Sequence, residues 1–338
     1  MAVNQRQSSG DNSVVVQAGG NVNLHGPSYG EVRQIALDLL RANFIEVQGI
    51  AKKTVDARFN ELVDIFLKKM STAGVDLSVM QDPDMQYSFA IAGREYARSG
   101  DEEQKRILLE LLLNKSSAKA RSLKSIVFGE AISTVGRLTS SQITALAANY
   151  SVHHLAEGSI ATHEELTKAL RLGILPFKEG FLIDEIDARH LAYAGCIQNT
   201  YFIPRFGLIF QDKFPRLFQS GIDESEMPQD WNAFKNEVFA PSPIGDGRFW
   251  LKADSVDAAK GLANKIGRPD LAERFARFIQ FNQWGSDDHF YDAILVSLVP
   301  EFADVIESWE TSSFRSMQAT SVGSTIGRTY WELELGID

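Results

Sequence analysis

Histidines stand beside carboxylates at two places where a metal site or acid–base chemistry could be sought. His153 and His154 are adjacent, with His163-Glu164-Glu165 downstream, and Asp287-Asp288-His289 follows a Gly-Ser pair. Adjacent residues on a helix point about 100° apart, so the two histidines cannot both face one metal ion. Acidic residues are favoured in the first turn of a helix by its dipole, which explains the second group. We therefore expect no bound metal and no cofactor.

A third group combines Asp187, His190 and Cys196. A carboxylate three residues before a histidine on a helix can orient the imidazole, and a histidine can activate a cysteine nucleophile. The same spacing is also typical of an ordinary surface pair. The run Tyr193-Ala194-Gly195-Cys196 is typical of a buried helix terminus whose thiol is unreactive packing. We favour the structural interpretation and assign no catalytic residue, which leaves enzyme activity open.

Two further patterns have a chemical and a structural interpretation. Gly323–Thr329 has three residues between its glycines where a phosphate loop has four, and Arg328 where that loop has lysine, so we expect close packing or a flexible tail. Phenylalanines recur every four residues near basic side chains, as a base-stacking surface or a partner groove would require. Prolines interrupt this run and phenylalanine usually lies in the core, so we expect core packing. The run is Phe202, Phe206, Phe210, Phe214 and Phe218.

The composition limits the partners of the chain. Its 338 residues carry 34 Lys+Arg and 44 Asp+Glu, a net charge of −10, which disfavours nucleic acid as a partner. The single cysteine cannot form an intrachain disulfide, which favours a reducing compartment. Apolar runs are far shorter than the roughly 20 residues that span a membrane. We expect a cytoplasmic protein without a membrane partner.

Most of the chain must form helices. Apolar residues recur at helical spacing through residues 31–156, for example in the stripe Leu123, Ile126, Val127 and Ala131. Residues 157–338 are also helical but are interrupted by prolines, with a short strand expected at Arg248–Leu251. Capping boxes are predicted for the pairs Ser99 and Glu102, Thr139 and Gln142, and Thr162 and Glu165. The predicted fold is mainly α, a multi-helical body with a short N-terminal β arm or hairpin. Its domains are 1–30, 31–156 and 157–338.

Residues 1–30 differ from the rest of the chain. Two short strands, rich in valine and with alternating apolar residues, flank the turn Gly19-Gly20-Asn21. Strands this short are marginal alone, so they need the helical body or another copy of the chain as a partner. We predict that this arm forms a homo-oligomer, as a closed sheet or a filament. The predicted oligomerisation residues are Val14, Val16, Gln17, Gly19, Val22 and Leu24.

Several segments resemble known families. The chain resembles the uncharacterised bacterial LPO/Vpar family in Gln81–Tyr87 and Arg94–Asp101, with Gly10–Ser13, Gln17–Gly19 and Tyr193–Cys196 adding to the likeness. This resemblance implies a bacterial origin and no particular activity. The tetrad Val16-Gln17-Ala18-Gly19 is similar to the core of amyloid-type (RHIM-like) signalling motifs in cell-death adaptors and bacterial immune effectors. Ala18 is smaller than the aliphatic residue usual there.

These features favour a non-enzymatic bacterial adaptor that assembles through its N-terminal arm and binds a partner protein. By analogy of architecture, phage defence or stress response would be its setting. The alternative is a hydrolase-type enzyme whose site is scattered over the chain. A pore-forming effector is disfavoured because no apolar segment is long enough.

Overall fold

The computed structural model describes residues 27–42, 49–155, 160, 162–200, 204–219, 221–242, 247–253, 255–282 and 290–337. Within these ranges the chain is mainly α-helical, as predicted. The predicted β arm lies outside the described residues. So do all six predicted oligomerisation residues: Val14, Val16, Gln17, Gly19, Val22 and Leu24.

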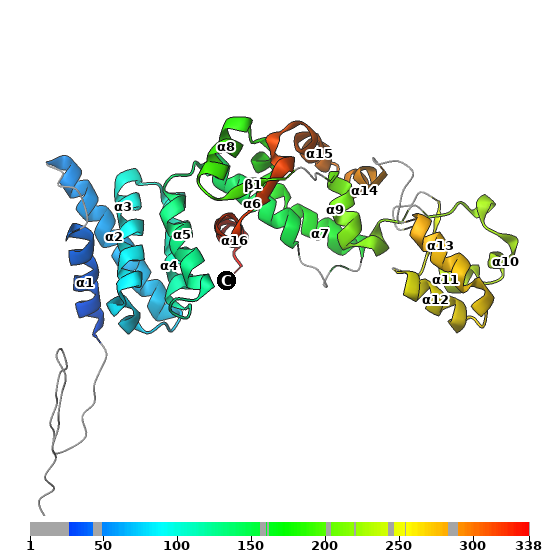
Figure 1. Cartoon of the computed structure of the whole chain (residues 1–338), viewed down its shortest axis with the longest axis horizontal. Coiled ribbons are helices and arrows are strands. Elements are labelled where there is room, and N and C mark those ends of the chain that lie inside the picture. The colour runs from blue at the N-terminus through cyan, green and yellow to red at the C-terminus, as the bar shows by residue number, and fades with distance from the viewer. Residues whose placement is uncertain are drawn as a thin grey trace, which may run out of the picture.

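The first group of helices, here called the N-terminal bundle, lies at one end of the molecule (Figure 1). Short connections let its long helices pack side by side. It comprises α1 (Tyr29–Ala42), α2 (Ile50–Thr72), the 3₁₀ helix η1 (Leu77–Gln81), α3 (Pro83–Ser99), α4 (Glu102–Ser116) and α5 (Leu123–Val135).

The second group, the central unit, combines the middle of the chain with its C-terminal end. Its first part contains α6 (Ser140–His154), α7 (His163–Gly173), η2 (Leu175–Leu182), α8 (Glu185–Tyr193), β1 (Ile197–Asn199), α9 (Phe206–Lys213) and η3 (Pro215–Leu217). Its second part contains α14 (Phe290–Leu298), α15 (Phe302–Thr311), η6 (Ser313–Ser316), β4 (Met317–Ala319) and α16 (Ser321–Leu335). The two parts are joined by the antiparallel pair β1 and β4, in which Gln198 lies opposite Gln318.

The third group, the distal unit, occupies the other end of the molecule (Figure 1). In sequence it lies between α9 and α14, which pack on each other in the central unit. It contains η4 (Glu224–Glu226), α10 (Gln229–Asn232), α11 (Lys235–Val238), β2 (Phe239–Pro241), β3 (Phe249–Leu251), α12 (Val256–Lys265), η5 (Pro269–Leu271) and α13 (Ala272–Asn282). Strand β3 confirms the short strand expected at this place.

Two separate hydrophobic cores follow from this arrangement. The larger core runs continuously from α1 in the N-terminal bundle to α16 in the central unit. The smaller core lies within the distal unit and includes Trp231, Phe239 and Phe275. The boundary predicted at residue 156 falls in a segment, 156–159, that lies outside the described residues.

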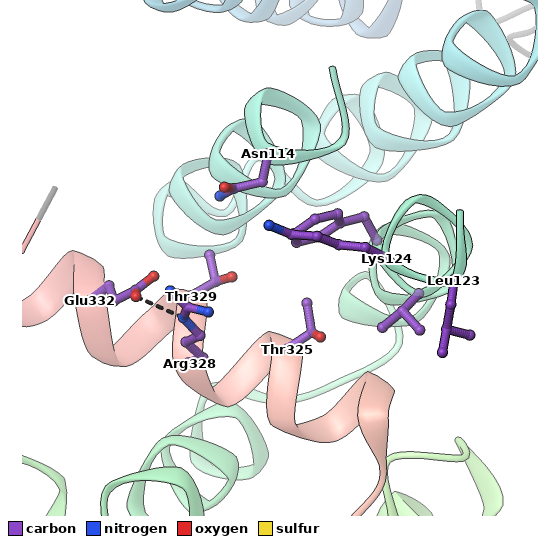
Figure 2. A pocket seen from close by; sticks show the side chains of 9 residues that line it. Asn114, Leu123, Lys124, Thr325, Arg328, Thr329 and Glu332 are labelled. Atoms are coloured by element: carbon purple, nitrogen blue, oxygen red, sulfur yellow. Dashed lines mark hydrogen bonds and ion pairs between the residues drawn. The ribbon is translucent and has the colours of Figure 1, made fainter. Parts of the chain in front are cut away.

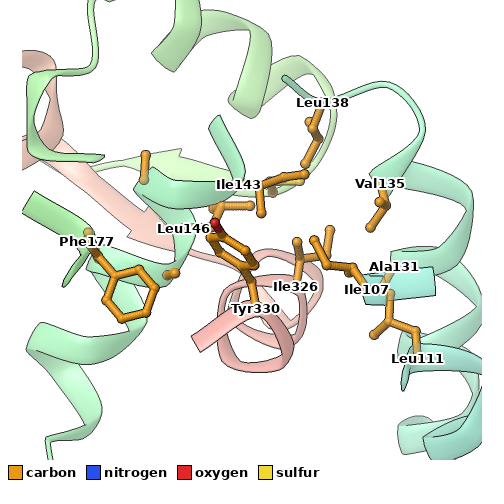
Figure 3. Close-up of a cluster of buried hydrophobic side chains, with 14 of the residues drawn as sticks. Ile107, Leu111, Ala131, Val135, Leu138, Ile143, Leu146, Phe177, Ile326 and Tyr330 are labelled. Carbon is orange, nitrogen blue, oxygen red and sulfur yellow. The ribbon is translucent and has the colours of Figure 1, made fainter. Parts of the chain in front are cut away.

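Helix α16 joins the N-terminal bundle to the central unit. Its Ile326 and Tyr330 lie among side chains of α4 and α5 on one side and of α6 on the other (Figure 3). A Cβ at Gly323 would lie 1.9 Å from the carbonyl oxygen of Cys196, and one at Gly327 would lie 2.3 Å from that of Leu146. Only glycine permits these approaches. The close packing expected of the two glycines is therefore confirmed.

The predicted helix starts are only partly correct. Capping boxes are present at Thr139 with Gln142 and at Thr162 with Glu165. The predicted box of Ser99 with Glu102 is wrong, because Asp101 caps α4 and accepts a hydrogen bond from the Gln104 backbone at 2.9 Å. Ser99 instead ends α3.

The predicted stripe of α5 marks the wrong face of that helix. Leu123 and Ile126 are 75% and 50% exposed, whereas Phe128, Ile132 and Val135 are buried with Ala131. The helix has apolar residues on two faces, and the packing against α4 and α16 selects the second. The two exposed side chains lie at the start of α5, beside the site described next.

Candidate functional site

A half-open cavity of about 510 Å³ lies between the end of α4, the start of α5 and α16 (Figure 2). Three helices that are far apart in the sequence contribute its walls. The lining residues are Asn114, Leu123, Lys124, Val127, Phe128, Thr325, Arg328, Thr329 and Glu332.

The start of α5 and one face of α16 position these side chains. The hydroxyl of Ser122 caps α5 by accepting a hydrogen bond from the Ser125 backbone at 3.2 Å, so the lining residues of α5 occupy its first two turns. The α16 residues recur at positions i, i+3, i+4 and i+7 from Thr325, which places them on one helical face. The glycines Gly323 and Gly327 hold a different face of α16 against the central unit.

The charges in the cavity are unequal. Arg328 donates from Nε to Oε1 of Glu332 at 2.7 Å, and this hydrogen bond raises the pKa of the arginine. Lys124 has no carboxylate within ion-pair distance among the described residues; its Nζ lies 5.8 Å from the centre of the Phe128 ring. One positive charge of the lining residues is therefore left without a partner carboxylate.

The remaining lining residues divide into a polar and an apolar set. In Figure 2, Asn114, Lys124, Thr325 and Thr329 reach toward a common space from three helices. Leu123, Val127 and Phe128 supply the apolar wall on α5. The lining set has no histidine or cysteine, and its only carboxylate is held by Arg328, so the arrangement suits binding and not proton transfer.

Two buried lysines of α4 contrast with Lys124. Lys115 lines a smaller cavity of about 90 Å³, where its Nζ lies 2.6 Å from Oδ2 of Asp84 and 3.1 Å from the Ser125 carbonyl oxygen. Lys105 lies 2.5 Å from carboxylate oxygens of both Glu61 and Glu102. Buried ammonium groups need such partners, and both lysines have them within the bundle.

Tyr96 completes the polar cluster around Lys105. Its hydroxyl donates to Oε2 of Glu61 at 2.6 Å, and burial together with this hydrogen bond raises the pKa of Tyr96 to about 12. Tyr96 belongs to the segment Arg94–Asp101, whose last residue is the cap of α4. The roles of this segment seen here are structural: a helix end, a cap and a buried polar cluster.

The candidate pair Asp187 and His190 is bridged by Gln142 of α6. Nε2 of Gln142 donates to Oδ1 of Asp187 at 2.9 Å, and its Oε1 lies 3.1 Å from Nδ1 of His190. Cys196 is fully buried, and burial raises the pKa of its thiol to about 11. The expected burial of Cys196 is therefore confirmed, and a neutral buried thiol is a poor nucleophile.

The other sequence candidates are also accounted for. His154 stacks on Tyr150 with ring centres 4.3 Å apart. The neighbouring His153 is exposed. Nowhere in the described ranges do three histidine, cysteine or acidic side chains gather as a metal site would require. Asp287-Asp288-His289 lies outside the described residues.

The phenylalanine run lies in the core, as predicted. Phe206 contacts Phe181, Phe302 and Trp309, with ring centres between 5.2 and 5.9 Å apart. A base-stacking surface would require exposed rings, and these are covered. The buried members are Phe206, Phe210, Phe214 and Phe218, and Phe202 lies outside the described residues.

The cavity itself was not predicted from the sequence. Thr325, Arg328 and Thr329 fall within the segment Gly323–Thr329, which partly resembles a phosphate loop in sequence, but they form a helix face and not a loop. The signal available was the i, i+3, i+4, i+7 spacing of polar residues opposite two glycines. Nothing in the sequence indicated that Lys124 would lie across from them.

Comparison with known proteins adds a family and no activity. None of the helices in the described ranges combines the length and apolarity that crossing a membrane requires. No curated protein and no solved structure matches the chain. The model of one protein family matches residues 26–336, nearly the whole chain. The chain therefore belongs to this uncharacterised family.

Proposed function

We propose that the protein is a non-enzymatic bacterial interaction protein that self-assembles through residues 1–30. The observation that carries the proposal is the even spacing of Val14, Val16, Val22 and Leu24 in the sequence, which would make one face of a strand apolar. The segment contains no lysine, the residue that commonly blocks pairing at exposed strand edges. Identical strands with low charge can pair and satisfy each other's backbone groups.

The first helix of the body has its own N-terminal cap, which supports a division between residues 1–27 and the helical body. Ser28 accepts the backbone hydrogen bond of Val32 at 3.0 Å, and the Glu31 carboxylate accepts from the Ser28 backbone and hydroxyl at 2.8 Å each. The family match starts at residue 26, so residues 1–25 precede it. A chain that starts at Ser28 keeps every one of these contacts.

Structural roles for the chemically suggestive residues support a non-enzymatic protein. Gln142 bridges Asp187 and His190, and the Cys196 thiol is buried and neutral. We further propose that the family is the LPO/Vpar family, that the protein is cytoplasmic, and that defence or stress response is its setting. The last of these rests on analogy of architecture alone.

Light scattering on four chains tests the role of the arm. They are the full chain, a chain starting at Ser28, the double variant Val16→Lys/Gln17→Lys, and the matched control Val3→Lys/Gln5→Lys. The control adds the same two charges within the arm but outside the predicted strands. We expect the full chain and the control to be oligomeric, and the other two chains to be monomers, because like charges repel in paired strands.

Circular dichroism of all four chains checks that the helical body stays folded. The same oligomeric state in all four would rule out the arm as the assembly element. If the control dissociates as fully as the Val16→Lys/Gln17→Lys variant, total charge and not strand pairing governs the assembly. Electron microscopy of the full chain then separates a closed oligomer from a filament.

A further inference from the structure

We propose that the cavity between α4, α5 and α16 binds a small organic anion, with one phosphate or carboxylate group on an apolar body. The inference goes beyond self-assembly and does not depend on it. It rests on the uneven charge, the polar groups and the apolar wall of the cavity.

The charge of Lys124 is the first argument. Lys105 and Lys115 of α4 each lie within 2.6 Å of a carboxylate oxygen, whereas Lys124 has no such partner among the described residues. The chain as a whole carries a net charge of −10, so a cavity with an excess positive charge is a local exception. An ammonium group of this kind attracts an anion at short range.

The neighbouring donors are the second argument. Arg328 uses one N–H group on Glu332, and a guanidinium has five such groups, so others remain for a ligand. The hydroxyl of Thr329 lies on the same face of α16 as Arg328, whereas the Thr325 hydroxyl donates to the Ser321 carbonyl oxygen at 2.8 Å. Cations and hydroxyls around one space are the groups that hydrogen-bond the oxygens of a phosphate or carboxylate.

The size and the apolar wall define the rest of the ligand. A cavity of about 510 Å³ is in the range of ligand sites, whereas the 90 Å³ cavity beside Lys115 has room for little more than water. Leu123, Val127 and Phe128 offer apolar surface next to Lys124, and Leu123 is 75% exposed. The geometry thus favours an anion with an apolar body over a free inorganic ion.

The position of the cavity gives binding a structural consequence. Lys124 belongs to the N-terminal bundle, and Arg328 to the helix that joins the bundle to the central unit. One anion held by both side chains would connect the two parts. Binding should therefore raise the thermal stability of the full chain.

Isothermal titration of the full chain tests the proposal with four probes: phenyl phosphate, benzoate, inorganic phosphate and phenol. We expect phenyl phosphate or benzoate to bind more tightly than inorganic phosphate, and phenol to bind least. Lys124→Gln should weaken the tighter probe about tenfold, as the loss of a charge-assisted hydrogen bond does. Lys119→Gln is the matched control, because this substitution removes the same charge at an exposed residue that does not line the cavity.

A second pair of variants does not depend on the lysine. Leu123→Asp places a negative charge at the cavity, and Ile126→Asp places one on the same helix outside the lining residues. Both side chains are largely exposed, so both variants should fold. We expect only Leu123→Asp to weaken binding.

The outcomes separate the anion classes and can overturn the proposal. Tighter binding of phenyl phosphate identifies a phosphate ligand, and tighter binding of benzoate identifies a carboxylate. The proposal would be overturned if neither organic anion bound at concentrations up to about 10 mM, because specific ligands ordinarily bind more tightly than that. Equal weakening by Lys124→Gln and Lys119→Gln would also overturn it, since only the general charge would then matter.

Discussion

His163 couples the protonation of one side chain to the stability of the fold. It is the first residue of α7, and only 8% of it is exposed. Its Nε2 lies 2.9 Å from the Leu217 carbonyl oxygen, its Nδ1 has no hydrogen-bond partner, and its ring packs near Trp250. Burial lowers the pKa of His163, although the Leu217 carbonyl opposes this effect. The folded protein therefore prefers the neutral ring.

We predict that the free energy of unfolding falls as the pH is lowered through about 6.5, the ordinary pKa of histidine in an unfolded chain. Above that pH both states hold a neutral ring. Below it the unfolded chain takes up a proton that the folded protein resists, so stability is lost. His163→Gln keeps an amide donor for Leu217 and cannot titrate, so urea unfolding between pH 7.5 and 5 should show a smaller slope.

The variant His153→Gln is the comparison, because desolvation lowers the pKa of His153 to about 4. It should also make the slope smaller, by the same linkage between proton uptake and unfolding. A His163→Gln variant with the full slope would mean that other groups cause the acid sensitivity.

At the scale of the elements, two of the three predicted capping boxes are present, whereas the buried face of α5 differs from the predicted one. The boxes at Thr139 and Thr162 depend on residues three positions apart, so local sequence predicts them. The buried face of α5 depends on its packing against α4 and α16, so the stripe that begins at Leu123 does not predict that face. The cavity depends on the meeting of three distant helices, which the sequence does not display.

Helix α16 shows how a tertiary contact can oppose helix propensity. Alanine normally stabilises a helix interior relative to glycine by about 0.5–1 kcal/mol. At Gly327, however, a Cβ would lie 2.3 Å from the Leu146 carbonyl oxygen, where backbone atoms must move. At Gly261, in the interior of α12, a Cβ would have no atom within 4 Å.

We predict opposite effects of the same substitution at these two glycines. Gly261→Ala should raise the free energy of unfolding by about 0.5–1 kcal/mol. Gly327→Ala should lower it by about 1–3 kcal/mol, the range of overpacking in a filled core. Urea unfolding of both variants measures the difference. Stabilisation by Gly327→Ala would show that α16 does not lie as close to α6 as described.

At the scale of the whole molecule, the two hydrophobic cores share few connections. Gln219 donates to the carbonyl oxygens of Leu251 and Ala253 at 3.1 and 2.9 Å, and the His163 ring lies 5.5 Å from that of Trp250. The core of the distal unit is otherwise a separate cluster. The N-terminal bundle and the central unit, by contrast, share one core through α16. Local opening of the distal unit should therefore leave the larger core intact.

We predict that two equivalent truncations, one in each core, act on different parts of the molecule. Phe275 in α13 and Phe89 in α3 are both fully buried, so each change to alanine should cost its own core about 3–5 kcal/mol. Hydrogen exchange followed by mass spectrometry reports each helix separately. Phe275→Ala should speed exchange in α12 and α13 and leave α4 unchanged, because its partners Trp231 and Phe239 belong to the smaller core.

Phe89→Ala should do the reverse, because Phe89 packs on Phe66 in the bundle. Faster exchange in both regions for both variants would mean that the chain unfolds as one cooperative unit, and that the contacts of Gln219 and Trp250 couple the two cores tightly.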